Sequence, residues 1–248
     1  MATVILARPE SRNALNAALI AEIARCFDEL ADDDNVRVVV LTGEGSSFCA
    51  GADIGYMRDT ARFSYEENLE DARRLAGMYR AVDELPKPVV AKVLGAAIGG
   101  GAGLVAAADV AVAGEGTRFA FSEVRLGIAP ATIAPFVVRK IGLSRARALF
   151  LTGERFGTRE AREFGLIHDV SPEGDLDART EHVVSLLLQG GPAAQAAIKG
   201  LLRQVAATEP MEALGLMTGL IADLRTGEEG QEGLGAFLQK REPNWRDR

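Results

Sequence analysis

Short runs of aliphatic residues alternate with stretches of helical periodicity along the first half of the chain. Apolar positions recur at helical spacing over residues 16–31 and 58–84, and Asn13 or Asn16 is expected to cap the first helix. Alternation of strands and helices predicts parallel pairing with right-handed crossovers, and therefore an α/β fold. The predicted strands span residues 3–7, 36–41, 89–94, 109–113 and 118–121.

The second half of the chain has a different pattern. From Ala134 onward it is helical with short breaks, and the last helical stretch, residues 230–241, ends at Pro243. We therefore expect a core over residues 1–190 and a helical C-terminal region over residues 191–248.

Charge and composition narrow the class of protein. The net charge of −7 argues against non-specific binding to nucleic acid, which needs a basic face. No apolar run is long enough to span a membrane, and the first residues do not resemble a signal peptide, so we expect a cytoplasmic protein. Cys26 and Cys49 cannot form a disulfide framework or a zinc site, and Cys26 is interpreted as a small core residue. His168 and His182 lie far from the motifs below and are interpreted as structural or surface residues, and no metal cluster is visible.

Residues 95–103 form a glycine-rich run between a predicted strand and a predicted helix. A Walker A loop would end in Gly-Lys-Ser/Thr, and none is present. Residues 101–106 satisfy the dinucleotide-binding pattern G-x-G-x-x-A, with Glu123 as a conceivable ribose ligand, but the following helix has room for only about two turns before Asp109. The match to a nucleotide site is therefore weak.

A second turn of small residues, 48–54, also follows a buried strand and leads into a predicted helix. Small residues let a ligand approach the unpaired backbone N–H groups at the start of a helix. Two such donors from two separate turns are what an oxyanion hole needs to hold a developing enolate.

These motifs together resemble the enoyl-CoA hydratase/isomerase (crotonase) superfamily. The resemblance runs from about residue 3 to the end of the chain, in the order and spacing of the family. It is carried by RPESRNALN, FCAGADI, PVVAKVLGAAIGGGAGLVAAAD, FSEVRLGIAP and EGLGAFLQKREPNW. It implies a spiral of ββα units with a helical C-terminal trimerisation region.

The resemblance assigns most of the site through backbone groups and small residues. The two oxyanion donors would be the N–H groups of Ala52 and Gly100. Asp53 would cap a helix and lie on the path of coenzyme A. Phe237 and Lys240 match residues that reach the coenzyme A of a neighbouring subunit. The remaining substrate-binding candidates are Ala50, Ile54, Ala131 and Arg12. Arg12 could meet a phosphate of coenzyme A or be a solvated surface arginine.

The catalytic carboxylates depart from the pattern of the hydratases. Members of the family commonly carry two glutamates, and the first of these positions is Gly103 in this chain. The second is Glu123, within the segment Ser122–Gly127. Burial would raise the pKa of Glu123 and let it exchange protons near neutral pH.

Residues 130–135 resemble the loop of bacterial 3-methylglutaconyl-CoA and isohexenylglutaconyl-CoA hydratase-like members, which also tend to have glycine at the first position. Their substrates carry a distal carboxylate, which Arg125 or Arg139 could bind, although a surface or subunit-interface ion pair is the favoured role for either arginine.

Three functions are consistent with these features of the sequence. The first is a 2-enoyl-CoA hydratase with Glu123 as acid and base, and the second is a Δ3,Δ2-enoyl-CoA isomerase that uses Glu123 alone. The third is a non-catalytic protein that binds coenzyme A. No cofactor is expected, since coenzyme A is part of the substrate, and the resemblance implies a homotrimer or a dimer of trimers.

Overall fold

A parallel sheet forms the centre of the molecule. A computed structural model describes residues 1–246, and within them a five-stranded sheet has the order β1-β2-β3-β5-β8 with every pair parallel. A smaller sheet has the order β4-β6-β7, with β4 parallel and β7 antiparallel to β6. The strands are β1 (Ala2–Leu6), β2 (Val39–Gly43), β3 (Val89–Val93), β4 (Ala96–Ile98), β5 (Val110–Gly114), β6 (Arg118–Ala120), β7 (Arg155–Phe156) and β8 (Asp169–Ser171).

Helices pack on the sheets and continue beyond them. The α-helices are α1 (Ala17–Asp32), α2 (Ile54–Thr60), α3 (Tyr65–Glu84), α4 (Gly100–Ala107), α5 (Ala134–Ile141), α6 (Leu143–Thr152), α7 (Thr158–Phe164), α8 (Leu176–Leu188), α9 (Pro192–Ala207), α10 (Pro210–Thr226) and α11 (Glu228–Gln239). Short 3₁₀ helices span Pro9–Ser11, Glu123–Leu126, Glu173–Asp175 and Asn244–Arg246.

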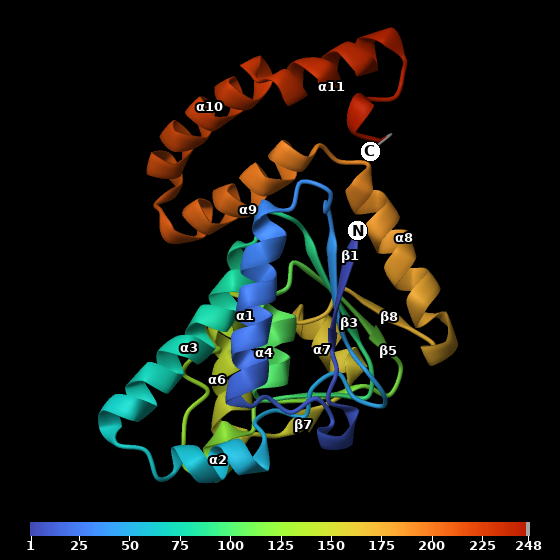
Figure 1. The fold of residues 1–248 in the computed structure, drawn as a ribbon. Helices are drawn as coiled ribbons and strands as arrows, with labels where there is room; N and C mark the ends of the chain where they lie inside the picture. Colours follow the sequence, from blue (N-terminus) through green and yellow to red (C-terminus); the bar gives the residue numbers. More distant parts are fainter. Residues whose placement is uncertain (247–248) are drawn as a thin grey trace.

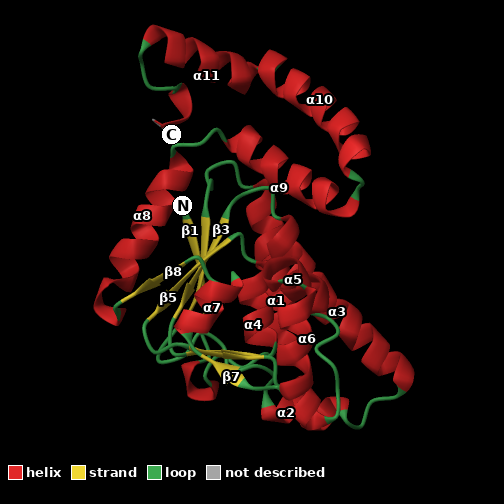
Figure 2. Ribbon diagram, turned by 180° about the vertical axis from the view of Figure 1, so that it is seen from behind, coloured by secondary structure: helices red, strands yellow, loops and turns green. Residues whose placement is uncertain are grey.

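The molecule has a sheet-and-helix body and a helical extension. Helices α1, α3 and α4 gather on one side of the larger sheet, and α8 lies on the other (Figures 1 and 2). Helices α9, α10 and α11 form the end of the molecule opposite to the end that holds α2 (Figure 1). None of the helices within residues 1–246 is both long and apolar enough to cross a membrane.

The predicted elements of the first half are confirmed, with differences at their edges. Asn16 caps α1, since its side chain accepts a hydrogen bond from the N–H of Leu19 at 2.9 Å. Asn13 instead lies buried and donates to the carbonyls of Glu44 and Ser47 at 2.8 and 2.7 Å. Cys26 is only half-buried and lies outside the core, so its predicted core position is wrong.

The helical prediction for the second half is partly wrong. Strands β7 and β8 interrupt the helices there, and β4 was also not predicted within the glycine-rich run. All three strands have only two or three residues, which is too short for a period-two pattern to emerge. Their backbone groups are satisfied by partners far away in the sequence, so tertiary pairing decides their conformation.

Candidate active site

The two small-residue turns lie side by side. The N–H of Cys49 donates to the carbonyl of Ala96, and the N–H of Ile98 donates to the carbonyl of Cys49, both at 3.0 Å. Gly51 has φ of +97°, and a Cβ built on it would lie 3.0 Å from the carbonyl oxygen of Ile98. Glycine is therefore required here both by its left-handed conformation and by the close approach of the second turn.

This arrangement frees the N–H groups of Ala52 and Gly100. Leu15 bonds the residues on either side of Ala52, donating to the carbonyl of Gly51 and accepting from the N–H of Asp53, so the N–H of Ala52 points away from Leu15. Gly100 is the first residue of α4, whose N–H has no intrahelical acceptor. Within residues 1–246, neither N–H donates to a protein acceptor outside a helix or strand. Both residues line the same cavity.

The cavity has a volume of about 440 Å³ and is built by several separate parts of the chain. The two turns supply one wall, helices α2 and α3 supply another, and residues 122–133 complete it. Most of the lining is apolar, with a few polar groups that converge on it, which is typical of a small-molecule site.

Glu123 lies in this cavity with an unsatisfied carboxylate. It begins a 3₁₀ helix, and its side chain reaches the glycine turn, since a Cβ built on Gly99 would lie 3.1 Å from Oε1. The other oxygen, Oε2, is buried and has no hydrogen-bond partner among the described residues. Burial raises the pKa of Glu123, opposed by a hydrogen bond from its own backbone N–H. Such a group is suited to exchanging protons.

The raised pKa of Glu123 predicts that this residue destabilises the fold at neutral pH. A carboxyl whose pKa is higher in the folded than in the unfolded state favours folding below the unfolded pKa, and this contribution is lost as the pH rises through the folded pKa. Glu123→Gln should therefore raise Tm at pH 7, and the gain should vanish below about pH 4. Thermal unfolding across pH would measure it, with the exposed Glu154→Gln as control. A Tm that falls equally at both pH values would contradict the prediction.

Core side chains occupy the space beside Gly103, where a glutamate would have to lie. A Cβ built on Gly103 would lie 2.3 Å from Cγ2 of Ile133 and 3.1 Å from Cε1 of Tyr79, and both side chains are fully buried. The hydroxyl of Tyr79 donates to the carbonyl of Gly100 at 3.1 Å, which ties α3 to the start of α4. Burial holds the pKa of Tyr79 well above its usual value, so this phenol stays protonated.

The sequence did not reveal the roles of Tyr79, Ile133, Tyr56 and Asp71. Tyr79 and Asp71 occur within the amphipathic pattern of α3, where a core position and a cavity position have the same spacing. The Tyr56 hydroxyl donates to the Asp71 carboxylate, a contact between α2 and α3 that no local signal indicates.

The predicted substrate-binding residues outside the C-terminal region divide into two groups. Ala50 and Ala131 line the cavity, whereas Arg12, Asp53 and Ile54 lie outside its lining. Arg12 is exposed, and its carbonyl accepts from the N–H of Ala50 at 2.9 Å, so it borders the first turn. Ile54 is also exposed, with 73% of its surface accessible.

Asp53 caps α2, as predicted. Its carboxylate accepts from the N–H groups of Gly55 and Tyr56 and pairs with Arg8 at 3.0 Å. The Arg8 guanidinium, followed by the cap bonds, lowers the pKa of Asp53. This capping role places α2 against the cavity.

Four further candidates do not line the cavity within this chain. Phe237 and Lys240 belong to the end of α11, at the opposite end of the molecule from α2 (Figure 1). Arg139 pairs with Asp83, and neither Arg139 nor Arg125 lines the cavity. The structure therefore gives no support to a distal carboxylate held by Arg125 or Arg139 of the same chain.

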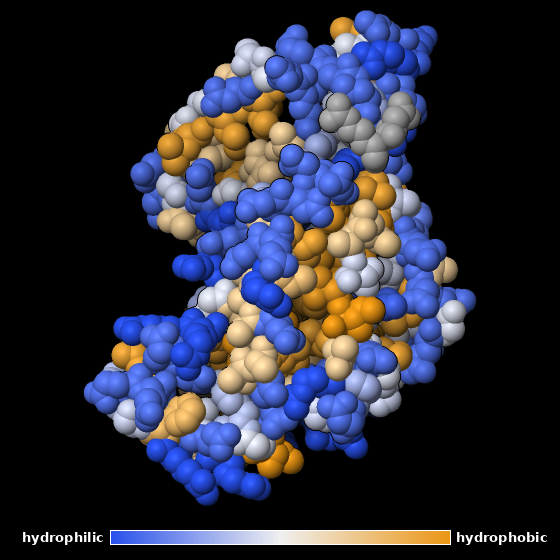
Figure 3. Space-filling view, viewed as in Figure 1, coloured by the Kyte–Doolittle hydropathy of each residue, from blue (hydrophilic) through white to orange (hydrophobic). Residues whose placement is uncertain are grey.

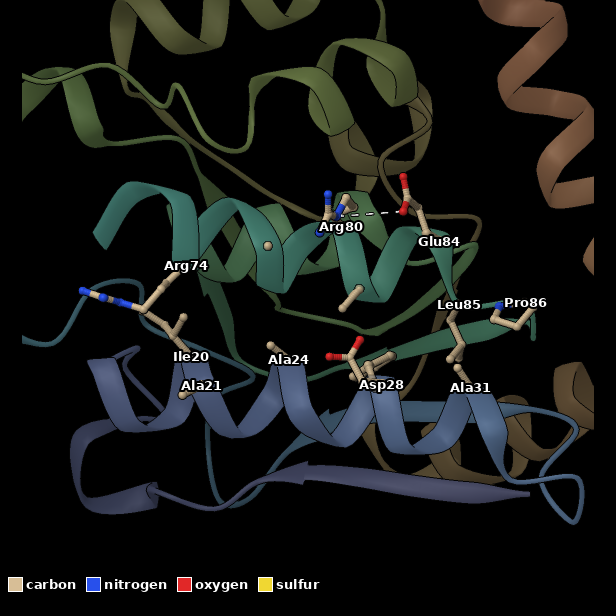
Figure 4. A pocket seen from close by; sticks show the side chains of 13 residues that line it. Ile20, Ala21, Ala24, Asp28, Ala31, Arg74, Arg80, Glu84, Leu85 and Pro86 are labelled. Atoms are coloured by element: carbon tan, nitrogen blue, oxygen red, sulfur yellow. Dashed lines mark ion pairs between the residues drawn. The ribbon is translucent and has the colours of Figure 1, made fainter. Parts of the chain in front are cut away.

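A second hollow, between α1 and α3, carries no comparable chemistry. Ala21 and Ala24 line it beside the Arg80–Glu84 ion pair, and Arg74 lies at one end (Figure 4). Among the residues that the structure describes, no group of three His, Cys, Asp or Glu side chains is arranged to hold a metal. His168 is structural, as predicted, since its Nδ1 accepts from the N–H of Ala111 at 2.9 Å.

Comparison with known proteins identifies the family to which the chain belongs. The whole chain, residues 1–248, matches the enoyl-CoA hydratase/isomerase family. The chain therefore belongs to this family and has the crotonase fold.

Individual relatives cover nearly the whole chain. It is 33% identical over 245 residues to a putative enoyl-CoA hydratase of Thermus thermophilus, covering 99% of this chain and 97% of that protein. It is 35% identical over 247 residues to the 2,3-dehydroadipyl-CoA hydratase of Escherichia coli, covering 98% and 94%. The crystal structure of an enoyl-CoA hydratase from Shewanella pealeana superposes with a TM-score of 0.95 at 38% identity, covering 98% of this chain and 91% of that one. The protein is accordingly an enzyme of the enoyl-CoA hydratase kind.

Proposed function

We propose that the protein hydrates the double bond of a 2-enoyl-CoA thioester. The observation that carries this proposal is the buried, unpartnered carboxylate oxygen of Glu123 in the same cavity as the N–H groups of Ala52 and Gly100. The names of the relatives support hydration over other reactions of the family.

The reaction follows from these three groups. The thioester carbonyl accepts hydrogen bonds from Ala52 and Gly100, which stabilise the negative charge of an enolate. Glu123 takes a proton from water as the water oxygen bonds to Cβ. The protonated Glu123 then delivers that proton to Cα, and the enolate collapses to the 3-hydroxyacyl thioester. One carboxylate therefore acts as base and then as acid, which its raised pKa favours.

Isomerisation is the second candidate, and the packing around Gly103 favours it. Ile133 and Tyr79 leave no room for a second carboxylate to orient water. A Δ3,Δ2-isomerase needs no such group, since Glu123 alone would remove a proton from C2 of a 3-enoyl thioester and return it to C4.

Purified protein and two substrates distinguish these reactions. With crotonyl-CoA, loss of the conjugated-enoyl absorbance indicates hydration. With 3-hexenoyl-CoA, gain of that absorbance indicates isomerisation. If neither signal changes, the catalytic proposal fails and binding of coenzyme A alone remains.

We also propose that coenzyme A lies along the first turn, past Ala50 and the exposed Ile54, with Arg12 near a phosphate. Ala50 lines the cavity, the carbonyl of Arg12 accepts from the N–H of Ala50, and Ile54 begins α2 just after the same turn. Phe237 and Lys240 would contribute from a neighbouring subunit.

The C-terminal helices are proposed to assemble subunits into a trimer or a dimer of trimers. Apolar side chains gather on the inner side of α10 (Figure 3), and Met211, Leu214 and Phe237 are exposed at 80%, 57% and 81%. Exposed apolar surface of this kind marks an interface. Light scattering should give a mass of three or six chains, and Phe237→Glu with Leu238→Glu should lower it. A monomeric mass for the unaltered protein would contradict the proposal.

A further inference from the structure

Acidic residues supply the charged side chains in the lining of the cavity that holds Glu123. Among the described residues that line it, Asp71 and Glu123 are the charged ones, and no Lys, Arg or His is present. The other polar lining residues near α2 and α3, Tyr56, Thr60 and Asn68, are neutral. An acyl group in this cavity therefore meets two carboxylates.

Asp71 is held in place on α3. Asp71 is 8% exposed, and its Oδ2 accepts a hydrogen bond from the hydroxyl of Tyr56 on α2. Burial, followed by this bond and the charge of Asp71, raises the pKa of Tyr56, which keeps the phenol protonated as the donor. The pair therefore offers hydrogen-bond acceptors to the cavity and leaves no free donor for an anion.

The cation beside Asp71 is engaged with carboxylates of α3 and does not line the cavity. Arg74 lies 3.4 Å from Oδ1 and also faces Glu70 at 3.8 Å. Its side chain is half-exposed and lines the α1–α3 hollow instead of the cavity (Figure 4). A substrate carboxylate would therefore lose its hydration and gain no ion pair.

We propose that the site accepts uncharged acyl groups and discriminates against acyl groups that end in a carboxylate, with Asp71 as the discriminating residue. This specificity rests on the proposed function for its site but names the substrate class more narrowly. Exclusion by a fixed like charge is a direct route to specificity, because the wrong ligand places two negative charges in one cavity.

Binding of saturated thioesters tests this without any reaction. Isothermal titration calorimetry would compare hexanoyl-CoA, adipyl-CoA and the terminal amide of adipyl-CoA. The amide has the shape of adipyl-CoA without its charge. Adipyl-CoA should bind about a hundredfold more weakly than the other two. Equal binding of adipyl-CoA and its amide overturns the proposal, whether or not any variant folds.

Variants locate the effect at Asp71. Asp71→Asn keeps an acceptor for Tyr56 and should reduce the preference for the amide over adipyl-CoA at least about tenfold. The neighbouring Glu70→Gln removes an equal charge outside the cavity and should leave the preference unchanged. Tyr56→Phe retains the charge and should also retain the preference. An unchanged preference in Asp71→Asn, or an equal loss in Glu70→Gln, overturns the assignment.

The result is separable from the outcome for hydration. The preference for uncharged thioesters with no turnover of any 2-enoyl-CoA would refute the proposed reaction alone. Turnover of crotonyl-CoA together with equal binding of adipyl-CoA and its amide would refute the specificity alone.

Discussion

Glu123→Gln should lower kcat by about 10³-fold while changing KM little. General acid–base groups contribute about 10² to 10⁴ in rate, and an amide can neither accept the proton of water nor return it to Cα. A loss of 10³ corresponds to about 4 kcal/mol of transition-state stabilisation. In the proposed reaction the thioester is held by the backbone of Ala52 and Gly100, which the substitution leaves intact, so ground-state binding should persist. Steady-state kinetics on the enoyl-CoA that the unaltered protein consumes would measure both constants.

The matched control is Glu154→Gln, which removes the same charge from an exposed residue and should leave kcat within about twofold. The pH profile adds an independent signature. The kcat/KM of the unaltered enzyme should rise with pH through the raised pKa of Glu123, because the base must be ionised, and this limb should disappear in Glu123→Gln. A Glu123→Gln variant that keeps more than a tenth of kcat would show that another group moves the proton.

The two small-residue turns were predictable because their signal is local. Small residues after buried strands indicate close approach of backbone, and residues 48–54 and 95–103 both have this composition. The structure places the two turns side by side through hydrogen bonds between Cys49, Ala96 and Ile98. Motif order within a known family supplied this pairing; the composition of either turn alone would not.

The walls of the cavity were not predictable for the opposite reason. Whether Asp71 faces solvent or a cavity depends on α2, which begins directly after its cap residue Asp53 and brings Tyr56 against α3. The helical pattern of residues 58–84 indicates an amphipathic face but not what lies opposite it. For the same reason, Arg125 and Arg139 were reasonable candidates for a distal carboxylate until the structure placed them outside the cavity.

Gly103 illustrates how a sequence difference can be fixed by packing. In the sequence, glycine at this position indicates only that a carboxylate is lacking. That suggests that a glutamate placed there would restore a two-carboxylate site. The structure indicates otherwise, since Ile133 from residues 130–135 and Tyr79 from α3 occupy the space that the side chain would need.

Gly103→Glu should therefore destabilise the protein by about 3–5 kcal/mol and add no hydratase activity. The Cβ alone would lie 2.3 Å from Cγ2 of Ile133, and overpacking of a core costs about 1–3 kcal/mol. The carboxylate beyond it would be buried without a charged partner, which adds a desolvation penalty. Chemical denaturation would measure the loss in the free energy of unfolding.

Two further variants separate the causes. Gly103→Ala carries the steric conflict without the charge and should lose about 1–3 kcal/mol. Ile133→Ala alone should also destabilise the protein, because it removes a buried side chain. The double variant should lose less than the sum of the two single losses, because the two substitutions act on the same contact. Additive losses in the double variant, or a Gly103→Glu protein as stable as the unaltered one, would show that the space behind Gly103 is open. Packing would then not explain why residue 103 is glycine instead of glutamate. It would also not explain why hydration relies on Glu123 without a second carboxylate.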